Sequence, residues 1–555
     1  MNLGDQKGST RMEILNLSLP AANRFASNYL EQSPEIQPFF HYRFNDGTDD
    51  AKRVAELSNR SFPRLEVAEH IESFMKRFPS SEAVIKSIDK LKTSNSLVVI
   101  GGQQAGILTG PLYSIHKVIS IIKLAEQKEA QLGVPVVPVF WIAGEDHDYQ
   151  EVNHVFVPVN QKVDKWTYPE RVLQKKMVSD IQLNKEVCIS WVQNLIENFG
   201  ETEHTNTLLA FAVKQVSIST NFVDFFANII MELFKDYGLL IVDSGNNEFR
   251  KVQKEFFKKQ IFNHEMITHK LLEQQRRIDE KDFPVTIDAS ERNANLFYYD
   301  QKMNDRILLE YDCDNDCFVG KNGALTFSRE QLVELAEENP ASLSNNVVTR
   351  PLMQEWLFPS IAFIAGPGEI SYWAELKLVF EYFQIKMPPI VPRLNITILD
   401  RSVETDVSDL RLNLNEILSN GTEKERTQFL EKIKDKEVAS LFSLAKEQLV
   451  NQYRLIEGKT AELDRGLLPL LKKNESYLLK ELGFMEAKLY EAGKLKHDNI
   501  LKKYDRVDLS LRPDGFPQER VWNIFYYLNQ YGLNLIQDLM SGKFEFDGRH
   551  KVIKM

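Results

Sequence analysis

Short apolar runs that end in polar residues recur along the chain and predict buried strands. Residues 97–102 (LVVIGG) and 134–144 (VPVVPVFWIAG) are two such runs, and residues 113–125 between them have apolar positions at helical spacing. We expect Thr109 to cap this helix and Pro111 to lie in its first turn. Continuous apolar runs are typical of strands covered on both faces, so the order strand, helix, strand predicts a β-α-β unit of the Rossmann kind.

Three later runs of the same kind complete the predicted sheet. They are residues 238–246 (GLLIVDSGN), 361–369 (IAFIAGPGE) and 387–395 (MPPIVPRLN). The intervals 151–236 and 247–345 are far longer than one crossover helix, so we interpret each as an insertion on the sheet core. Residues 306–312 (RILLEYD) alternate in polarity and predict a small α+β or β-rich subdomain in the second insertion.

Beyond Thr422 the chain becomes rich in Lys, Glu and Leu, and its apolar residues follow heptad-like spacing, which predicts a long coiled coil. These apolar residues include Leu441, Leu444, Leu463, Leu467, Leu471, Leu478, Leu482, Met485 and Leu489. Gly458, Gly466 and Pro469 interrupt the pattern, and a proline inside a helix costs ~3 kcal/mol or more, so we expect an antiparallel hairpin. An intramolecular stalk and a coiled coil that pairs two chains both fit, and we favour the second.

These patterns predict an α/β protein with a Rossmann-like parallel sheet core, two insertions and a long helical coiled coil. Residues 1–11 resemble an appended leader before a second start at Met12, and we exclude them from the fold. The expected segments are 12–150 (helical lead-in and first part of the core), 151–236 (first insertion), 237–246 (core strand), 247–345 (second insertion), 346–421 (second part of the core), 422–508 (coiled coil) and 509–555 (C-terminal segment returning to the core).

Composition excludes several classes of function. The formal net charge of −11 is spread over 555 residues, whereas a nucleic-acid binder needs a basic face. No stretch reaches the roughly 20 apolar residues of a membrane helix. The three cysteines, Cys188, Cys313 and Cys317, are too few for a disulfide framework and indicate a reducing, cytoplasmic compartment. No second ligand pair accompanies Cys313 and Cys317, so we expect no zinc site.

The first candidate site follows the first strand, in residues 101–117 (GGQQAGILTGPLYSIHK). Ligands bind at the carboxyl ends of parallel strands, and glycines let the backbone approach them closely. Gln103 and Gln104 are suited to orienting a polyhydroxylated or amide-bearing ligand, while Lys117 either lies on a solvated helix face or offsets substrate charge in the crevice. The motif matches neither GxGxxG nor the Walker pattern.

The second candidate is GEDHDYQE, residues 144–151, after another strand. Glu145, Asp146, His147 and Asp148 crowd like charges at a strand end, which costs stability unless a function requires it. Three uses remain open: His147 as a general base, the carboxylates as ligands of ammonium groups or Mg²⁺, or a divalent site made by Asp146, His147 and Asp148. We name all four as candidate catalytic residues and assign no metal site.

The third candidate is IAGPGEISYWAEL, residues 364–376, at a strand-to-helix turn. Glu369, Tyr372 and Trp373 lie at the expected helix start and are candidate substrate-binding residues. Arg350 and Arg393 flank the motif as clamps for a carboxylate or phosphate, which a guanidinium binds bidentately. Near the C-terminus, RPDGFPQER is either a helix-capping turn or a nucleotide contact through Arg512 and Arg520.

Five separated motifs occur in a fixed order from Met12 onward. They are GGQQAGILTGPLYSIHK, FWIAGEDHDYQE, TRPLMQEWLFP, IAGPGEISYW and DGFPQER. Together they resemble the bacillithiol biosynthesis cysteine-adding enzymes (BshC). The resemblance implies a Rossmann core similar to class I aminoacyl-tRNA synthetases, two insertions of the connecting-peptide type, and a coiled coil that pairs two subunits into a homodimer.

The resemblance also implies a ligase that joins L-cysteine to the amine of glucosaminyl-malate. Because a carboxylate does not condense with an amine unless it is activated, we expect an ATP-derived adenylate or acyl phosphate, and ATP or ADP and Mg²⁺ are the candidate cofactors. The expected catalytic group is Glu145–Asp148, and Gln103 and Gln104 would orient the sugar. The chain has no HIGH tetrad, only Thr109-Gly110-Pro111-Leu112 at that position, and no KMSKS, which argues against adenylate formation.

Two alternatives stay open at this point. One is a synthetase-like nucleotidyltransferase that acts on another small acid. The other is a coiled-coil scaffold that keeps a nucleotide pocket without turnover, against which the dense EDHD cluster speaks.

Overall fold

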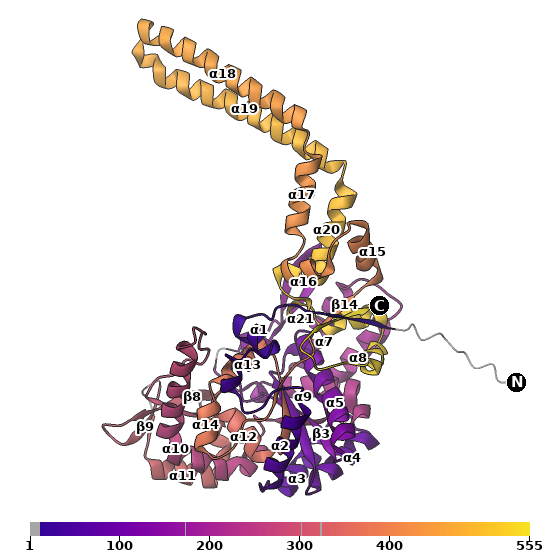
Figure 1. Ribbon diagram of the computed structural model, residues 1–555, viewed down its shortest axis with the longest axis vertical. Coiled ribbons are helices and arrows are strands. Elements are labelled where there is room, and N and C mark those ends of the chain that lie inside the picture. The colour runs from indigo at the N-terminus through magenta and orange to yellow at the C-terminus, as the bar shows by residue number, and fades with distance from the viewer. Residues whose placement is uncertain (1–11, 173, 301, 322, 324) are drawn as a thin grey trace, which may run out of the picture. The chain divides into compact units, whose positions relative to one another are not determined.

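The computed structural model describes residues 12–555 except 173, 301, 322 and 324, so the expected leader lies outside the described residues. The chain forms two compact units. The first comprises Met1–Ile398 and Phe516–Met555, and the second comprises Leu399–Gly515. The described sheets belong to the first unit except for Leu399, the last residue of one strand, and long helices dominate the second (Figure 1).

A five-stranded parallel sheet forms the centre of the first unit. Its strands are β2 (Leu97–Gln103), β3 (Val136–Ile142), β6 (Leu240–Asp243), β12 (Ser360–Ala365) and β13 (Ile390–Pro392). The spatial order is β13-β12-β2-β3-β6, with every neighbouring pair parallel. This is the doubly wound order, whose switch point lies between β2 and β12. The five strands coincide with the five apolar runs, which confirms the Rossmann-like core. The likeness to aminoacyl-tRNA synthetases stays a prediction.

Helices cover the sheet because its strands are apolar on both faces. The helix α5 (Tyr113–Leu132) packs against β2, β3 and β12, while α3 (Arg64–Met75) and α4 (Glu82–Lys92) pack against β6. The remaining helices of the first unit that begin outside the segments 151–236 and 247–345 are α1 (Arg24–Leu30), α2 (Gly47–Ser58), α6 (Tyr149–Val152), α12 (Thr349–Leu357), α13 (Pro367–Ala374), α14 (Lys377–Tyr382), α21 (Gln518–Val521), α22 (Ile524–Tyr531) and α23 (Leu535–Ser541), while α11 (Arg329–Glu338) belongs to the segment 247–345.

The turn between β2 and α5 differs from the expected helix cap. Thr109 does not cap α5, because the chain forms a tight turn in which Leu108 has φ 50° and Thr109 has φ 75°. A Cβ on Gly106 would lie 2.7 Å from the Cα of Gly110, so this turn requires glycine there. Pro111 precedes the helix instead of lying in its first turn, and α5 begins at Tyr113.

The segment 151–236, which we interpret as the first insertion, contains the hairpin β4 (His154–Val159) and β5 (Lys162–Thr167) and the helices α7 (Lys185–Glu197), α8 (Thr205–Ile218) and α9 (Phe222–Phe234). The second contains α10 (Asn247–Asp279) and an antiparallel sheet of order β10-β9-β8-β7-β11. These strands are β7 (Asn293–Asp300), β8 (Asp305–Asp312), β9 (Cys317–Gly320), β10 (Thr326–Phe327) and β11 (Leu343–Asn345). A third sheet pairs β1 (Glu13–Leu17) antiparallel with β15 (His550–Lys554), beside β14 (Ile396–Leu399).

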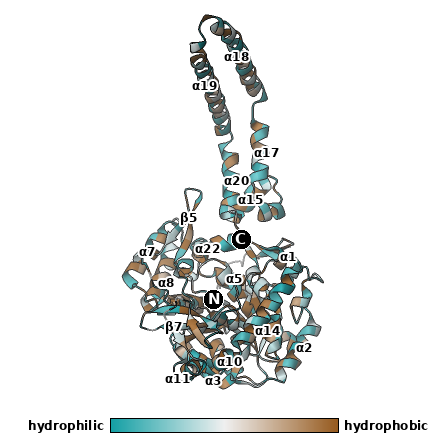
Figure 2. Ribbon diagram, turned by 90° about the vertical axis from the view of Figure 1, so that its left-hand side faces the viewer, coloured by the Kyte–Doolittle hydropathy of each residue, from teal (hydrophilic) through white to brown (hydrophobic). Residues whose placement is uncertain are grey.

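The second unit contains a long helical hairpin. Its helices are α15 (Arg401–Asp409), α16 (Leu414–Asn420), α17 (Glu423–Ile433), α18 (Lys436–Leu463), α19 (Leu468–Leu495) and α20 (Asp498–Leu511). The helices α18 and α19 pack side by side, and Asp464 caps the turn between them by accepting the backbone N–H of Gly466 (Figures 1 and 2). Pro469 lies in the first turn of α19, where its missing N–H is harmless, so the predicted hairpin is confirmed.

None of the described helices combines the length and the apolar character that a membrane crossing requires. The long hairpin helices, for example, carry charged residues throughout (Figure 2).

Candidate active site

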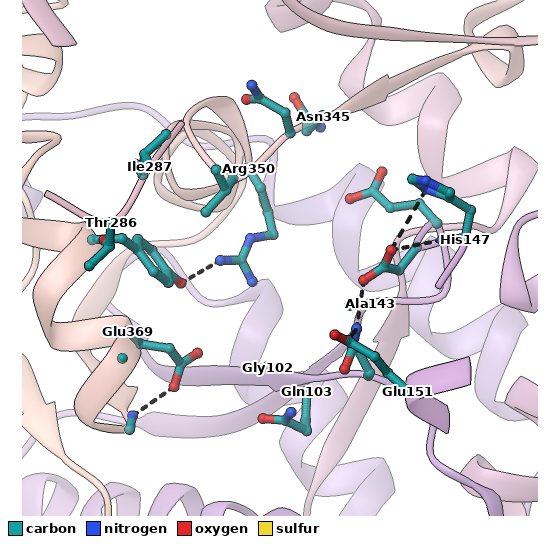
Figure 3. A pocket seen from close by; sticks show the side chains of 18 of the residues that line it. Gly102, Gln103, Ala143, His147, Glu151, Thr286, Ile287, Asn345, Arg350 and Glu369 are labelled. Carbon is teal, nitrogen blue, oxygen red and sulfur yellow. Dashed lines mark hydrogen bonds and ion pairs between the residues drawn. The ribbon is translucent and has the colours of Figure 1, made fainter. Parts of the chain in front are cut away.

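A cavity of about 970 Å³ opens at the carboxyl ends of β2, β3 and β12, which is the switch point of the sheet. Most of the residues singled out from the sequence line it. They are Gln103, Gln104, Lys117, Glu145, Asp146, His147, Arg350, Glu369, Tyr372, Arg393 and Arg520. Figure 3 shows Arg350 and Glu369 on one side of this cavity and His147 and Glu151 on the other.

A carboxylate side of the cavity is built from the ends of β2 and β3. The side-chain amide of Gln104 donates to Asp146 Oδ2 and to Glu151 Oε2, each at 2.7 Å. Asp146 Oδ1 also accepts the backbone N–H of His147 at 2.7 Å. One glutamine therefore holds two carboxylates toward the same space, and the pair can bind an ammonium group or accept its proton.

Protonation within the carboxylate side follows from burial and from nearby charge. Burial raises the pKa of Asp146, but the Gln104 hydrogen bond and the Arg306 charge outweigh it and leave that pKa below its ordinary value. Burial and the same arginine hold the pKa of His147 below its ordinary value. At neutral pH the site thus presents an ionised Asp146 beside an uncharged imidazole.

Glu145 lies beneath this side of the cavity, 5% exposed. Its burial raises its pKa, although Arg306, Arg250 and Arg350 oppose the shift. The preceding Gly144 leaves no room for a side chain, because a Cβ there would lie 2.1 Å from both Asp243 Oδ1 and Ser179 Oγ.

Asp243, at the end of β6, holds this loop from the neighbouring strand. It accepts hydrogen bonds from Ser179 Oγ and from the backbone N–H of Gly245. Burial raises its pKa to about 6 in spite of these bonds. Its packing against Gly144 therefore fixes the backbone from which the catalytic candidates extend.

A cationic side faces the carboxylates. The buried Lys117 donates to Gly102 O at 2.7 Å and forms an ion pair with Glu369 at 2.5 Å. Burial lowers the pKa of Lys117, and Glu369 opposes that shift. Arg350, from α12, donates to the hydroxyl of Tyr372, and burial raises the pKa of that hydroxyl to about 12. Lys117 thus faces the crevice and not a solvated helix face.

The C-terminal segment completes the cationic side. Glu519 accepts hydrogen bonds from both terminal nitrogens of Arg393, at 2.6 and 2.7 Å. One of its carboxylate oxygens also lies 3.2 Å from His116 Nδ1. Burial raises the pKa of Glu519, but Arg393 and His116 together hold it far below its ordinary value. Asn523 donates to the carbonyls of Leu108 and Gly110, so the same segment fixes the turn after β2.

Three predicted residues lie outside the cavity lining. Asp148 is exposed beyond the rim. Trp373 is 1% exposed, and its ring packs on Phe363 in the core, because it lies one helical position past Tyr372 and so faces the sheet. Arg512 donates to the backbone carbonyls of Leu418 and Gly515, which favours the capping turn over a nucleotide contact for this residue.

Sequence reasoning missed Arg306, Glu151 and Glu519. Glu151 and Glu519 lie inside quoted motifs, and their charges beside Asp146 and Arg393 were the available signal. Arg306 comes from β8 of the second insertion, and no local pattern distinguishes it from other strand residues. It nevertheless reaches His147 with its Nη1, 3.4 Å from the imidazole Nδ1.

The cavity carries donors for anionic groups. No three His, Cys, Asp or Glu side chains among the described residues are grouped to hold a metal ion. Arg350, Lys117 and Arg520 supply the donors that carboxylate and phosphate oxygens require. The geometry can therefore place an anionic group on one side and an amine on the other.

Comparisons with known proteins match two family models to consecutive parts of the chain. Residues 12–394 match the family model "Bacillithiol biosynthesis BshC, N-terminal Rossmann-like domain", and residues 396–555 match "Bacillithiol biosynthesis BshC, C-terminal coiled-coil domain". Proteins from Geobacillus thermodenitrificans and Anoxybacillus flavithermus, each named "Putative cysteine ligase BshC", are 41% identical to this chain over 98% of its length and 100% of theirs. A Geobacillus kaustophilus protein of the same name is 41% identical with the same coverage. The chain therefore belongs to the BshC family of bacillithiol biosynthesis.

Proposed function

We propose that the chain is a cysteine ligase that joins the carboxyl group of L-cysteine to the amine of glucosaminyl-malate. The observation that carries this proposal is the two-sided cavity, in which the carboxyl groups of Asp146 and Glu151 face Arg350 and Lys117. Glucosaminyl-malate has an amine at one end and two malyl carboxylates at the other. Its charges complement those of the cavity when the amine lies at Gln104 and the malyl group lies toward the arginines.

The carboxylate side prepares the nucleophile. An ammonium group cannot attack a carbonyl, so the substrate amine must first lose a proton. Asp146 is the proton acceptor in this proposal, because its carboxylate faces the cavity and its low pKa keeps it ionised. Gln103 and Gln104 orient the sugar hydroxyls beside it.

The cationic side accepts the activated acid. A free carboxylate does not condense with an amine in water, so the cysteine carboxyl must first become a mixed anhydride with a phosphate derived from ATP. Arg350 and Arg520 offset the phosphate charge, and Mg²⁺ can accompany the nucleotide as it enters. The amine nitrogen then bonds to the carbonyl carbon, the carbonyl π electrons move onto oxygen, and reformation of the carbonyl expels phosphate with the electrons of its C–O bond.

The test is direct. Purified protein is incubated with L-cysteine and glucosaminyl-malate, with and without ATP and Mg²⁺, and bacillithiol is measured by mass spectrometry. Product that appears only with ATP, together with ADP or AMP, supports the proposal and identifies the activated species. No bacillithiol under any nucleotide condition, from folded protein, contradicts it.

We also propose that two chains pair through the hairpin α18–α19 in the cytoplasm, where its three free cysteines stay reduced. No described side chain of these two helices is buried, and Leu441, Leu455 and Leu463 are 61%, 68% and 87% exposed. An apolar surface of this extent is typical of an interface between subunits. Light scattering should give twice the mass of one chain, and Leu441→Ser with Leu455→Ser should give a monomer with unchanged first-unit stability. A wild-type monomer at micromolar concentration contradicts this pairing.

A further inference from the structure

The guanidinium of Arg306 is fixed at the edge of the cavity by three contacts. Its Nε donates to Ser344 Oγ at 3.0 Å, and its Nη2 donates to the carbonyl of Asn345 at 2.6 Å. Its central carbon lies 3.9 Å from the ring centroid of Phe297. Because these contacts occupy one face and two nitrogens of the group, the direction of the remaining Nη1 is determined.

That remaining nitrogen, Nη1, lies 3.4 Å from Nδ1 of His147. A guanidinium stays protonated in proteins and has donors only, so Nδ1 must be the acceptor and cannot carry a proton. Nδ1 does not donate a hydrogen bond to Asp146 Oδ1 either, because the two atoms are 3.8 Å apart, which is too far for a hydrogen bond. An uncharged His147 in this position therefore carries its single proton on Nε2.

The charges around the imidazole keep it uncharged. Burial lowers the pKa of His147, Arg306 and Lys175 lower it further, and Asp146 and Asp148 oppose the shift without reversing it. Protonation would also place a second donor against Arg306 Nη1. The ring lines the cavity with its side chain 28% exposed (Figure 3). The hydrogen-bond contact of the ring within the described part of the chain is made by Nδ1, and Nε2 has no partner there.

We infer that Arg306 fixes His147 as the Nε2–H tautomer, and that His147 acts as a hydrogen-bond donor to the oxyanion of amide formation and not as the general base. The inference rests on the proposed ligation for the identity of the oxyanion. A donor aimed at the place where negative charge develops is worth about 10²–10³ in kcat in acyl-transfer enzymes. Arg306 is a positioning residue in this scheme, since it acts through His147.

The reaction divides between neighbouring groups. Asp146, which is partly exposed, first passes the ammonium proton to water and is ionised again. The amine then bonds to the carbonyl carbon of the mixed anhydride and its second proton moves to Asp146, while the carbonyl oxygen gains the π electrons and accepts the N–H of His147. When the carbonyl reforms, the phosphate leaves and the imidazole keeps its proton. The histidine thus undergoes no net change, and the proton that the amine loses resides on a carboxylate.

The tautomer can be measured without substrate. Protein labelled with ¹⁵N-histidine is examined by long-range ¹H–¹⁵N correlation at pH 7.5, and the His147 ring is assigned by its loss in His147→Gln. We expect a protonated Nε2 and an unprotonated Nδ1. In Arg306→Met, which keeps the packing on Phe297 but has no donor, the Nδ1 shift should change, and Arg306→Lys should restore part of the wild-type pattern. A protonated Nδ1 in the wild type overturns the inference.

Activity separates the donor from the base even if the Arg306 variants fail to fold. Glutamine places an N–H near the position of Nε2 and asparagine places one near Nδ1, whereas alanine has neither. His147→Ala should lower kcat about 100-fold. His147→Gln should recover at least tenfold over alanine, and His147→Asn should not. Equal loss in the glutamine and alanine variants, both folded, overturns the donor role. An inactive wild type refutes the ligation alone, since the tautomer measurement stands independently.

Discussion

The sheet core and the helical hairpin use apolar residues in opposite ways. In the core, the side chains of β3 are fully covered by the helices on both faces. In the hairpin, Leu463 is 87% exposed and no described residue of α17, α18 or α19 is buried. Ion pairs differ in the same way: Arg393 and Glu519 are 4% and 8% exposed, whereas Lys446 and Glu486 are 34% and 33% exposed. A hydrophobic pattern therefore indicates internal packing in the sheet core, whereas in the helical hairpin it indicates an exposed apolar surface.

The largest expected effect is on the buried pair of the core. Glu519→Gln removes the anion and leaves Arg393 buried without a countercharge, which costs about 3–5 kcal/mol of unfolding free energy. Urea titration of the first unit, followed by tryptophan fluorescence, measures the loss. A change below about 1 kcal/mol would remove the distinction between buried and exposed pairs.

The same pair predicts an acid dependence. Because the pKa of Glu519 is depressed in the folded protein, its stabilising contribution is fully present above the ordinary value of 4.5 and is lost as pH falls toward the folded pKa. Below pH 4.5 the difference in stability between wild type and Glu519→Gln should shrink, and above it the difference should be constant. A difference that grows on acidification would contradict the assignment.

Two neighbouring aspartates of the site differ in the same way, because one faces the cavity and the other is exposed. Asp146 lines the cavity and Asp148 does not. Asp146→Asn should lower kcat about 100-fold, because a general base contributes at least about that much, while Asp148→Asn should change it by no more than about twofold. Steady-state formation of bacillithiol measures both. Equal losses would show that the cluster acts through its total charge.

The smallest expected effect is in the hairpin. Glu486→Gln breaks an ion pair with Lys446 that is exposed to solvent and screened by salt, so it should cost about 0.2–1 kcal/mol. Circular dichroism during thermal unfolding at low and at high salt measures it. A loss comparable to that of Glu519→Gln would mean that the hairpin is packed as tightly as the core.

The local sequence pattern was sufficient to predict those elements that can be recognised without knowing which distant segments they pack against. All five core strands could be predicted, because a strand buried on both faces is apolar along its whole length. The carboxyl ends of adjacent parallel strands meet at one edge, so Gln104 and Asp146 could be placed near each other as well. The hairpin turn followed from the position of Pro469.

Contacts between distant segments could not be predicted in this way. Arg306 and His147 are 159 residues apart, and their contact depends on how the second insertion folds over the sheet. The prediction that Trp373 binds substrate was wrong for a different reason. Adjacent residues on a helix point in directions about 100° apart, and the motif did not specify which of its residues faces the cavity. The prediction that Thr109 caps the helix was wrong because a left-handed turn takes the place of the cap. Sequence pattern rarely reveals such a turn at a non-glycine residue.

The return of residues 518–523 to the core has a consequence for synthesis on the ribosome. Glu519 and Asn523 hold parts of the cavity that belong to Arg393 and to the turn at Leu108–Gly110. Segments fold as they emerge, from the N-terminus onward. The nascent chain therefore carries an unfinished cavity throughout translation of the hairpin, and competence to bind substrate arises only after nearly the whole polypeptide has been made.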